Sequence, residues 1–405
     1  MVPSHALAAH AGRLHRSIAR CGSTCPTACQ PAVGHGVYHR YLDQLEFAEQ
    51  VGFDGIGVNE HHANAYGLMP SPNIMAATLT RRTSKAALVV LGNSIALYNP
   101  PLRVAEEFAM LDVLSGGRLV AGFPVGTSMD TNYAYGTIPA LTREKYAEAH
   151  ELIRKAWAAD EPFAFNGRYT KLRYVNCWPK PIQRPAPPIF IPGGGSVETY
   201  DFCDSTYVLY LSYLGYMRAK LLMDGYWKRV AERGVDEIAV SRRLRPGDLH
   251  VADTDARPRS STGRTSAQLR RCLRLLRLRR RAGLHRTVKT IQTGALSQFT
   301  RAAARSYPGA NLEGPDREPL RHRRLARDGA PAVEEMIKTL RVGNVFCLLH
   351  LGDMPDDKVR HSTRLFAEKV IPKLRNLWPE WNDRRPASGC IRWATARVPL
   401  KVAAE

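Results

Sequence analysis

Residues 51–67 read VGFDGIGVNEHHANAYG and residues 86–126 read AALVVLGNSIALYNPPLRVAEEFAMLDVLSGGRLVAGFPVG, and these two stretches decide the fold. Three apolar runs lie within them, from Gly55 to Val58, from Ala86 to Leu97 and from Leu119 to Phe123. Each run is followed by glycine or polar residues, a pattern typical of buried strands. The sequence therefore predicts three strands in this region.

A helical pattern joins the second and third runs. Apolar residues recur at helical spacing between Leu102 and Leu114, after Pro100 and Pro101 and before Gly116. Proline at the start and glycine just past the end are typical of a helix. Strands that alternate with helices predict an α/β fold with parallel strands and right-handed crossovers.

Polar residues follow each predicted strand. They are NEHH at residues 59–62, NSIALYN at residues 93–99 and PVGTS at residues 124–128. The carboxyl ends of parallel strands carry the active site in α/β barrels and open α/β sheets. We therefore expect these three segments to line one mouth of the fold.

The segment NPPLRVAEEFAMLDVLSGGR at residues 99–118 resembles the signature of the bacterial luciferase-like flavin-dependent monooxygenases, and the EHH triplet at residues 60–62 is similar to that family's. The resemblance implies a (β/α)8 TIM barrel that uses reduced FMN or, in some branches, the deazaflavin F420. Such barrels begin with a strand, whereas residues 1–35 give little strand signal. The expected barrel therefore has a damaged first strand, and an irregular insertion after its seventh strand.

Three parts are expected along the chain: an irregular segment at residues 1–35, the barrel at 36–375 and a tail at 376–405. Within the barrel, residues 256–330 form the insertion, and eleven arginines without any acidic residue fall between 257 and 286. One hypothesis is that residues 1–35, 257–286 and 306–327 derive from a shifted reading frame in a GC-rich gene. The alternative is a genuine basic insertion near the site, and resequencing the gene would separate the two.

His61 is the candidate catalytic residue. Adjacent histidines point to opposite sides, so one of His61 and His62 can face the cleft while the other packs. A neutral imidazole suits proton transfer at neutral pH. The resemblance matches His61 to the family's active-site histidine beside the flavin ring. The alternative is a structural pair bonded to neighbouring backbone.

Seven residues are candidates for binding the cofactor. Amide and hydroxyl groups after the second strand can bond the polar edge of a flavin, or can serve as a strand-end cap. Three glycines that end a strand before a helix can approach a phosphate. The turn after Leu119 to Phe123 resembles the family's turn after the fourth strand, where luciferase carries a phosphate-contacting arginine and this chain has Val125. The candidates are Asn93, Ser94, Gly122, Gly126, Gly194, Gly195 and Ser196.

Other recognisable residues are expected to be structural. Arg118 and Asp112 are interpreted as a charge pair on the face away from the mouth, together with Arg103. Aromatic residues that can wall the ring, or alternatively pack in the core, are Tyr133, Tyr135, Tyr146 and Trp178.

Composition limits the function classes. The net charge of +21 is concentrated in the arginine-rich segment, which argues against a nucleic-acid partner for the fold as a whole. No apolar run is long enough for a membrane span, and no signal peptide is evident, so a cytoplasmic protein without a membrane partner is expected. Cys21, Cys25 and Cys29 lack CxxC pairing, so no metal site is expected.

The resulting prediction is an enzyme, a monooxygenase that uses reduced FMN and O2 to oxygenate a small organic substrate. A separate flavin reductase would supply the reduced flavin, and a homodimer is compatible with the resemblance. The alternatives are F420-dependent oxidoreduction on the same barrel, a non-functional relic, and nucleic-acid binding through the arginine-rich segment.

Overall fold

Parallel strands form the centre of the protein. The computed structural model describes residues 31–62, 68–126, 132, 134–193, 197–203, 208–211, 216–234, 248–252, 325–350, 354–375 and 377. Within these residues, seven parallel strands pair in the order β1-β2-β3-β6-β7-β8-β9. The strands are β1 (Gly55–Val58), β2 (Ala87–Val90), β3 (Leu119–Gly122), β6 (Ile189–Gly193), β7 (Val208–Leu211), β8 (Asp248–Ala252) and β9 (Val345–Leu348).

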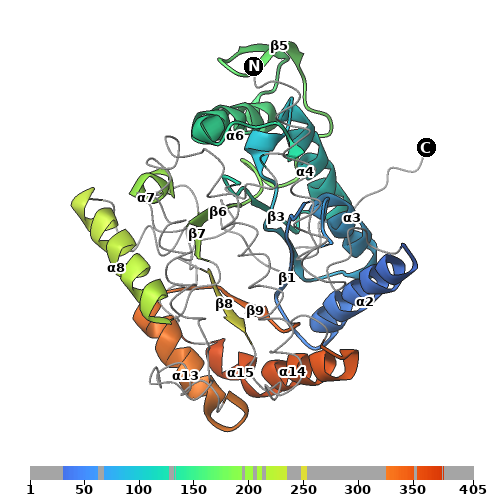
Figure 1. Cartoon of the computed structure of the whole chain (residues 1–405), viewed down its shortest axis with the longest axis vertical. Coiled ribbons are helices and arrows are strands. Elements are labelled where there is room, and N and C mark those ends of the chain that lie inside the picture. The colour runs from blue at the N-terminus through green and yellow to red at the C-terminus, as the bar shows by residue number, and fades with distance from the viewer. Residues whose placement is uncertain are drawn as a thin grey trace, which may run out of the picture.

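Helices surround the strands as an outer ring (Figure 1). Their apolar faces pack on the sheet, as the fully buried Phe108 and Trp157 do from two neighbouring helices. The helices are α2 (Pro31–Gln50), α3 (Pro72–Arg82), α4 (Leu102–Ser115), α6 (Thr142–Ala158), α7 (Val197–Cys203), α8 (Tyr216–Glu232), α13 (Leu325–Leu340), α14 (Asp356–Lys369) and α15 (Ile371–Leu374). An antiparallel hairpin, β4 (Phe163–Asn166) and β5 (Lys171–Val175), lies outside the ring beside α6.

The sheet curls, and the ring of helices closes. Phe190 of β6 and Phe346 of β9 lie three strands apart in the sheet, yet their rings meet edge to face at 6.4 Å. Gln44 of α2 donates to Asp356 of α14 at 2.7 Å, so the last part of the chain returns to the first described helix. A curled parallel sheet inside a ring of helices is the architecture of the expected TIM barrel, and the described residues contain seven of its eight strands, without pairing between β9 and β1. The prediction of a damaged first strand concerns mainly residues 1–30, which lie outside the described residues.

Several predicted elements have different bounds. The apolar run from Ala86 does not continue as a strand to Leu97, because β2 ends at Val90 and Ile95–Leu97 forms a 3-10 turn. Helix α2 begins at Pro31, within the segment expected to be irregular. The final helical segment is divided into α14, which ends at Lys369, three residues before Pro372, and α15; Pro372 has no N–H to donate.

Thr142 is not the N-cap of α6, although threonine is a favoured N-cap residue. It is the first residue of the helix, and Leu141 occupies the N-cap position. The Thr142 hydroxyl instead donates to Asn132 Oδ1 at 3.3 Å, so it links the helix to the loop after β3.

Arg118 and Asp112 do not form the expected charge pair with each other. Arg118 donates to backbone carbonyls, including that of Ala86 at 2.7 Å, and so joins the starts of β2 and β3. Asp112 accepts from Gln183 through its N–H at 2.9 Å and its side chain at 2.7 Å. Burial raises the pKa of Asp112, while the Gln183 bonds oppose this rise. Both residues are structural, at the end of the barrel opposite the strand carboxyl ends.

None of the described helices combines the length and the apolar character that crossing a bilayer requires.

Candidate active site

The carboxyl ends of β1, β2 and β3 meet, as the sequence predicts. The strands pair in parallel, so the segments that follow them leave the sheet at one edge. The Asn93 N–H donates to the Gly122 carbonyl at 3.2 Å, which ties the segment after β2 to the end of β3. His61, Ser94 and Gly126 follow these same three strands, so the described candidates share one mouth.

Glu60 is the centre of the hydrogen bonds at this mouth. Its side chain is 2% exposed. One carboxylate oxygen accepts the Ser94 N–H at 2.7 Å. The other accepts the Tyr98 hydroxyl at 2.7 Å and lies 2.9 Å from Nε2 of His62. A buried carboxylate requires such partners, and here they join the segments after β1 and β2.

Glycines allow the strand ends to approach one another closely. A Cβ on Gly92 would lie 2.5 Å from the backbone nitrogen of Glu60. A Cβ on Gly122 would lie 2.3 Å from the carbonyl oxygen of Val90. Gly126 has φ +75°, and a Cβ there would stand 3.0 Å from the Cβ of Ser94. Gly122 and Gly126 therefore have a packing role that the sequence did not indicate.

The two histidines have different surroundings. His62 is 7% exposed and packs between Glu60 and Tyr135, whose hydroxyl lies 3.4 Å from its Nδ1. The rings of His62 and Tyr135 meet edge to face at 4.9 Å. His61 is half-buried, and its backbone N–H donates to the Met69 carbonyl at 2.9 Å. His62 is thus the histidine that packs, and His61 remains the candidate for the cleft.

Asn93 has the surroundings of a strand-end cap. It is fully buried, and its amide exchanges two hydrogen bonds with that of Asn73, at 3.0 and 2.9 Å. Asn73 also donates to Glu107 of α4 at 2.6 Å. Both ends of the Asn93 amide are therefore bonded within the protein, which favours the structural alternative over a direct flavin contact.

The two tyrosines near Glu60 keep their protons. Burial, then the Glu60 charge, raises the pKa of Tyr98 far above its ordinary value. Burial and the same carboxylate also raise the pKa of Tyr135. Both phenols are therefore hydrogen-bond donors at neutral pH.

The aromatic residues expected to wall the ring have different locations. Tyr135 lies at the mouth against His62. Tyr146 is buried, and its hydroxyl donates to the Phe123 carbonyl at 2.8 Å, which is a core role. Trp178 follows the outer hairpin and is 78% exposed, so it does not wall this site. Tyr133 lies outside the described residues.

The strand that precedes the triple-glycine turn ends at the same edge of the sheet. This strand, β6, pairs with β3, and the Phe123 N–H donates to the Phe190 carbonyl at 2.9 Å. Gly194, Gly195 and Ser196 themselves lie outside the described residues. Their role in binding phosphate therefore stays a prediction. No side chain between Phe123 and Gly126 is charged.

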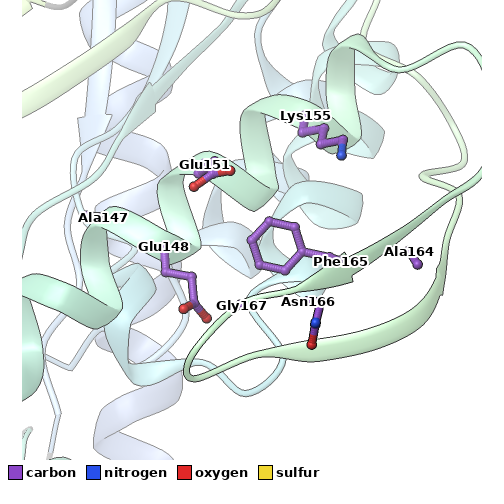
Figure 2. Close-up of a pocket in the computed structure, with 8 residues that line it drawn as sticks. All are labelled: Ala147, Glu148, Glu151, Lys155, Ala164, Phe165, Asn166 and Gly167. Carbon is purple, nitrogen blue, oxygen red and sulfur yellow. The ribbon is translucent and has the colours of Figure 1, made fainter.

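A groove of about 410 Å³ lies elsewhere, between α6 and the hairpin (Figure 2). Glu148, Glu151 and Lys155 of α6 face Phe165 of the hairpin across it. The Glu148 carboxylate accepts the backbone N–H of Arg168 at 2.6 Å and so docks the turn onto the helix. This groove is separate from the strand ends. Among the described residues, no cluster of three or more potential ligands suits a metal ion.

Sequence reasoning missed three residues of the site. Gly92 interrupts an apolar run, and this interruption is the one local signal that the strand ends early. Tyr98 and Asn73 gave no such signal, because their partners Glu60 and Asn93 are distant in the sequence.

Comparison with known proteins gives a consistent assignment. A family model described as luciferase-like monooxygenase matches residues 19–334. The chain is 33% identical over 125 residues to 4-hydroxyprotoasukamycin monooxygenase of Streptomyces nodosus subsp. asukaensis, covering 30% of this chain and 33% of that protein. It is 27% identical over 157 residues to the oxygenase component of flavin-dependent trigonelline monooxygenase of Acinetobacter baylyi, covering 38% and 43%. These matches span less than half the length of either relative.

Solved structures share the fold. Monooxygenase RslO1 from Streptomyces bottropensis aligns with a TM-score of 0.62 at 20% identity, covering 83% of this chain and 93% of that one. The oxygenating constituent of 3,6-diketocamphane monooxygenase from Pseudomonas putida, in complex with FMN, aligns at 0.61 and 16%, covering 86% and 96%. An F420-dependent secondary alcohol dehydrogenase aligns at 0.55 and 21%, covering 84% and 95%.

Proposed function

The chain belongs to the luciferase-like monooxygenase family, and on that premise we propose that it uses reduced FMN and O2 to oxygenate a small organic substrate. The observation that carries the proposal is the strand-end cluster. His61, Ser94 and Gly126 follow three adjacent parallel strands and so share one edge of the barrel. An oxygenase needs its proton-transfer group and its flavin contacts together at such an edge.

The described residues at the mouth suit a flavin ring. The isoalloxazine presents uncharged donors and acceptors, and Ser94 and His61 offer hydroxyl and imidazole groups. The backbone near Gly126 lies close to Ser94, because a Cβ there would meet the Ser94 hydroxyl oxygen at 3.1 Å. In this proposal Ser94 and Gly126 would hold the ring, and the buried Asn93 would fix the position of the segment that carries Ser94.

The phosphate is assigned to Gly194, Gly195 and Ser196. Their strand ends at the same edge as β3, and glycines let backbone N–H groups approach an anion. Val125 stands where luciferase has an arginine, so the turn after β3 offers no cation of its own between Phe123 and Gly126. The triple glycine is then the main phosphate contact.

His61 is proposed to hold and transfer a proton at the reacting centre. When bound, reduced flavin supplies the electrons that activate O2. The chain's own part is to orient the ring, to exclude water and to deliver a proton from the imidazole of His61. A separate reductase is proposed as the source of reduced flavin, since the relative from Acinetobacter baylyi is an oxygenase component.

The runner-up function is F420-dependent oxidoreduction. A solved F420-dependent alcohol dehydrogenase shares this fold. In addition, no side chain between Phe123 and Gly126 is charged, so this turn lacks the arginine that contacts the FMN phosphate in luciferase. In that case hydride transfer to or from the substrate would occur without O2.

Anaerobic titration tests the proposal. Purified protein is titrated with reduced FMN and, separately, with reduced F420, and binding is followed by absorbance. We expect tighter binding of reduced FMN. Addition of isotopically labelled O2 with a panel of small ketones and aldehydes should then give a product carrying one labelled oxygen atom. Preferential binding of F420, with substrate turnover that consumes no O2, would establish F420-dependent oxidoreduction instead.

A further inference from the structure

We propose that Glu60 is a positioning residue of this site. It fixes the tautomer of His62 and joins the segments after β1 and β2, and so it fixes the position of His61. The inference rests on the proposed function and extends it to a residue outside the expected flavin and proton-transfer contacts. Its basis is the geometry of three groups that meet one buried carboxylate.

The tautomer follows from the donor and acceptor inventory. An ionised carboxylate has only acceptor sites. The Ser94 N–H and the Tyr98 hydroxyl both donate to Glu60, at 2.7 Å each. His62 Nε2, at 2.9 Å from the same carboxylate, must therefore also carry a proton. In a neutral imidazole Nδ1 is then the acceptor, and the Tyr135 hydroxyl lies 3.4 Å from it.

The direction of the whole chain of hydrogen bonds is set by this carboxylate. Tyr135 donates to His62, His62 donates to Glu60, and Tyr98 donates to Glu60 from the other side. The chain runs from a tyrosine that is 43% exposed to a carboxylate that is almost wholly buried. Histidines are commonly oriented in this way, by a carboxylate bonded to one ring nitrogen.

His61 depends on this arrangement through the backbone. It lies between Glu60 and His62, which are both held by side-chain bonds, and its own N–H donates to the Met69 carbonyl at 2.9 Å. A proton-transfer group acts only within a narrow range of positions, so a shift of about 1 Å can lower a rate as much as about a hundredfold. Glu60 would thus influence the chemistry without touching the flavin.

Glu60→Gln is the decisive substitution, because it keeps the size of the side chain. The amide carbonyl must face the Ser94 N–H, since an NH2 there would oppose another donor. The NH2 then takes the place of the oxygen that meets His62 and Tyr98. His62 would have to accept at Nε2, so its proton would move to Nδ1.

Two measurements test the proposal. In protein with isotope-labelled histidine, nuclear magnetic resonance reports the His62 tautomer without any flavin, and His62→Gln assigns the signal. We expect Nε2–H in the wild type and Nδ1–H in Glu60→Gln. With reduced FMN bound, the rate at which O2 restores the absorbance of oxidised flavin should change roughly tenfold in this variant, while the dissociation constant for reduced FMN changes less than about threefold.

Two controls separate positioning from stability. Tyr98→Phe removes the other donor to the same oxygen and should leave the His62 proton on Nε2. Asp112→Asn weakens the buried contact with Gln183 at the opposite end of the barrel, so it should lower stability but not the flavin oxidation rate.

An unchanged tautomer in Glu60→Gln would overturn the proposal, and so would a reversed tautomer with an unchanged oxidation rate. A wild-type protein that fails to bind reduced FMN would instead count against the proposed function. The tautomer measurement keeps its meaning in that case, because it uses no flavin.

Discussion

His61 and His62 are neighbours in the chain, yet they have different surroundings. His62 is packed between a carboxylate and a phenol, whereas His61 is half-buried at the mouth. The alternation of side chains along an extended segment predicts such a division. The identity of the packed histidine depended on Glu60, which sequence spacing alone could not assign.

His61→Ala should abolish most oxygenation without loss of the fold. Removal of a positioned proton-transfer group lowers rates by about 10²- to 10⁴-fold, whereas the dissociation constant for reduced FMN should change little. Product formation by the wild type and the variant, with the same substrate from the ketone and aldehyde panel, measures the effect. The control is His361→Ala, an exposed histidine on α14. Full activity in His61→Ala would remove this residue from the mechanism.

Asn93→Ala should act mainly on stability. The substitution leaves the buried Asn73 amide without one of its partners, and an unsatisfied buried polar group costs about 1–3 kcal/mol. The free energy of unfolding in urea measures this loss. Because the two amides are each other's partners, Asn73→Ala with Asn93→Ala should lose less than the two single losses added. If the two losses in free energy of unfolding add strictly and Asn93→Ala binds reduced FMN much more weakly, a direct contact between Asn93 and the flavin would be supported instead.

At the scale of elements, sequence predicts what is local. Apolar runs and turn residues gave β1, β3, β6 and α4, because their causes lie within a few residues. The end of β2 at Val90 was not predictable in this way. Ser94 donates its N–H to Glu60, and this distant contact accompanies the departure of the chain from the strand. Tertiary contacts override the local apolar pattern here.

Gly122→Ala tests the close approach of β2 and β3. The added methyl group would stand 2.3 Å from the Val90 carbonyl oxygen, so the backbones would have to separate. Overpacking of this kind costs about 1–3 kcal/mol, and the free energy of unfolding in urea should fall by at least that much.

Gly36→Ala is the matched control for this prediction. Gly36 lies within α2, where a Cβ would meet nothing within 4 Å. Glycine inside a helix is less favourable than alanine by about 0.5–1 kcal/mol, so this variant should be slightly more stable than the wild type. Equal stabilities for the two variants would mean that the strand ends are looser than their positions indicate.

At the scale of the molecule, contacts between the ends of the described chain close the ring of helices. The rings of Phe53 and Phe366 stack at 5.9 Å, and Asp356 of α14 accepts from Gln44 of α2. We call these contacts the seam. His350 also belongs to the seam, with Nδ1 at 2.8 Å from the Gln44 side-chain oxygen. The family signature predicted the barrel as a whole. The residues of the seam come from α2, from the turn after it and from the segment after β9, so no single stretch of sequence could reveal them.

Asp356 gives this seam a pH dependence with a definite sign. The bonds from Gln44 and Arg360 lower the pKa of Asp356 below its ordinary value of 3.8. A lowered pKa means that the carboxylate contributes stability above pH 3.8, and that this contribution is lost as the pH falls further. The Asp356 side chain is 39% exposed, so solvent screening keeps the contribution below about 1 kcal/mol.

Asp356→Asn should therefore reduce the free energy of unfolding at neutral pH, and the wild type should approach the variant as the pH falls below 3.8. Asparagine can still accept from Gln44 but loses the charge that attracts Arg360. Urea unfolding at a series of pH values measures the difference. Asp224→Asn is the control, because the exposed Lys220–Asp224 pair lies within α8 and joins no two helices, so its loss should have a smaller effect at neutral pH. A gap between wild type and Asp356→Asn that widens on acidification would contradict this sign, because it would mean that the charged carboxylate of Asp356 destabilises the folded chain.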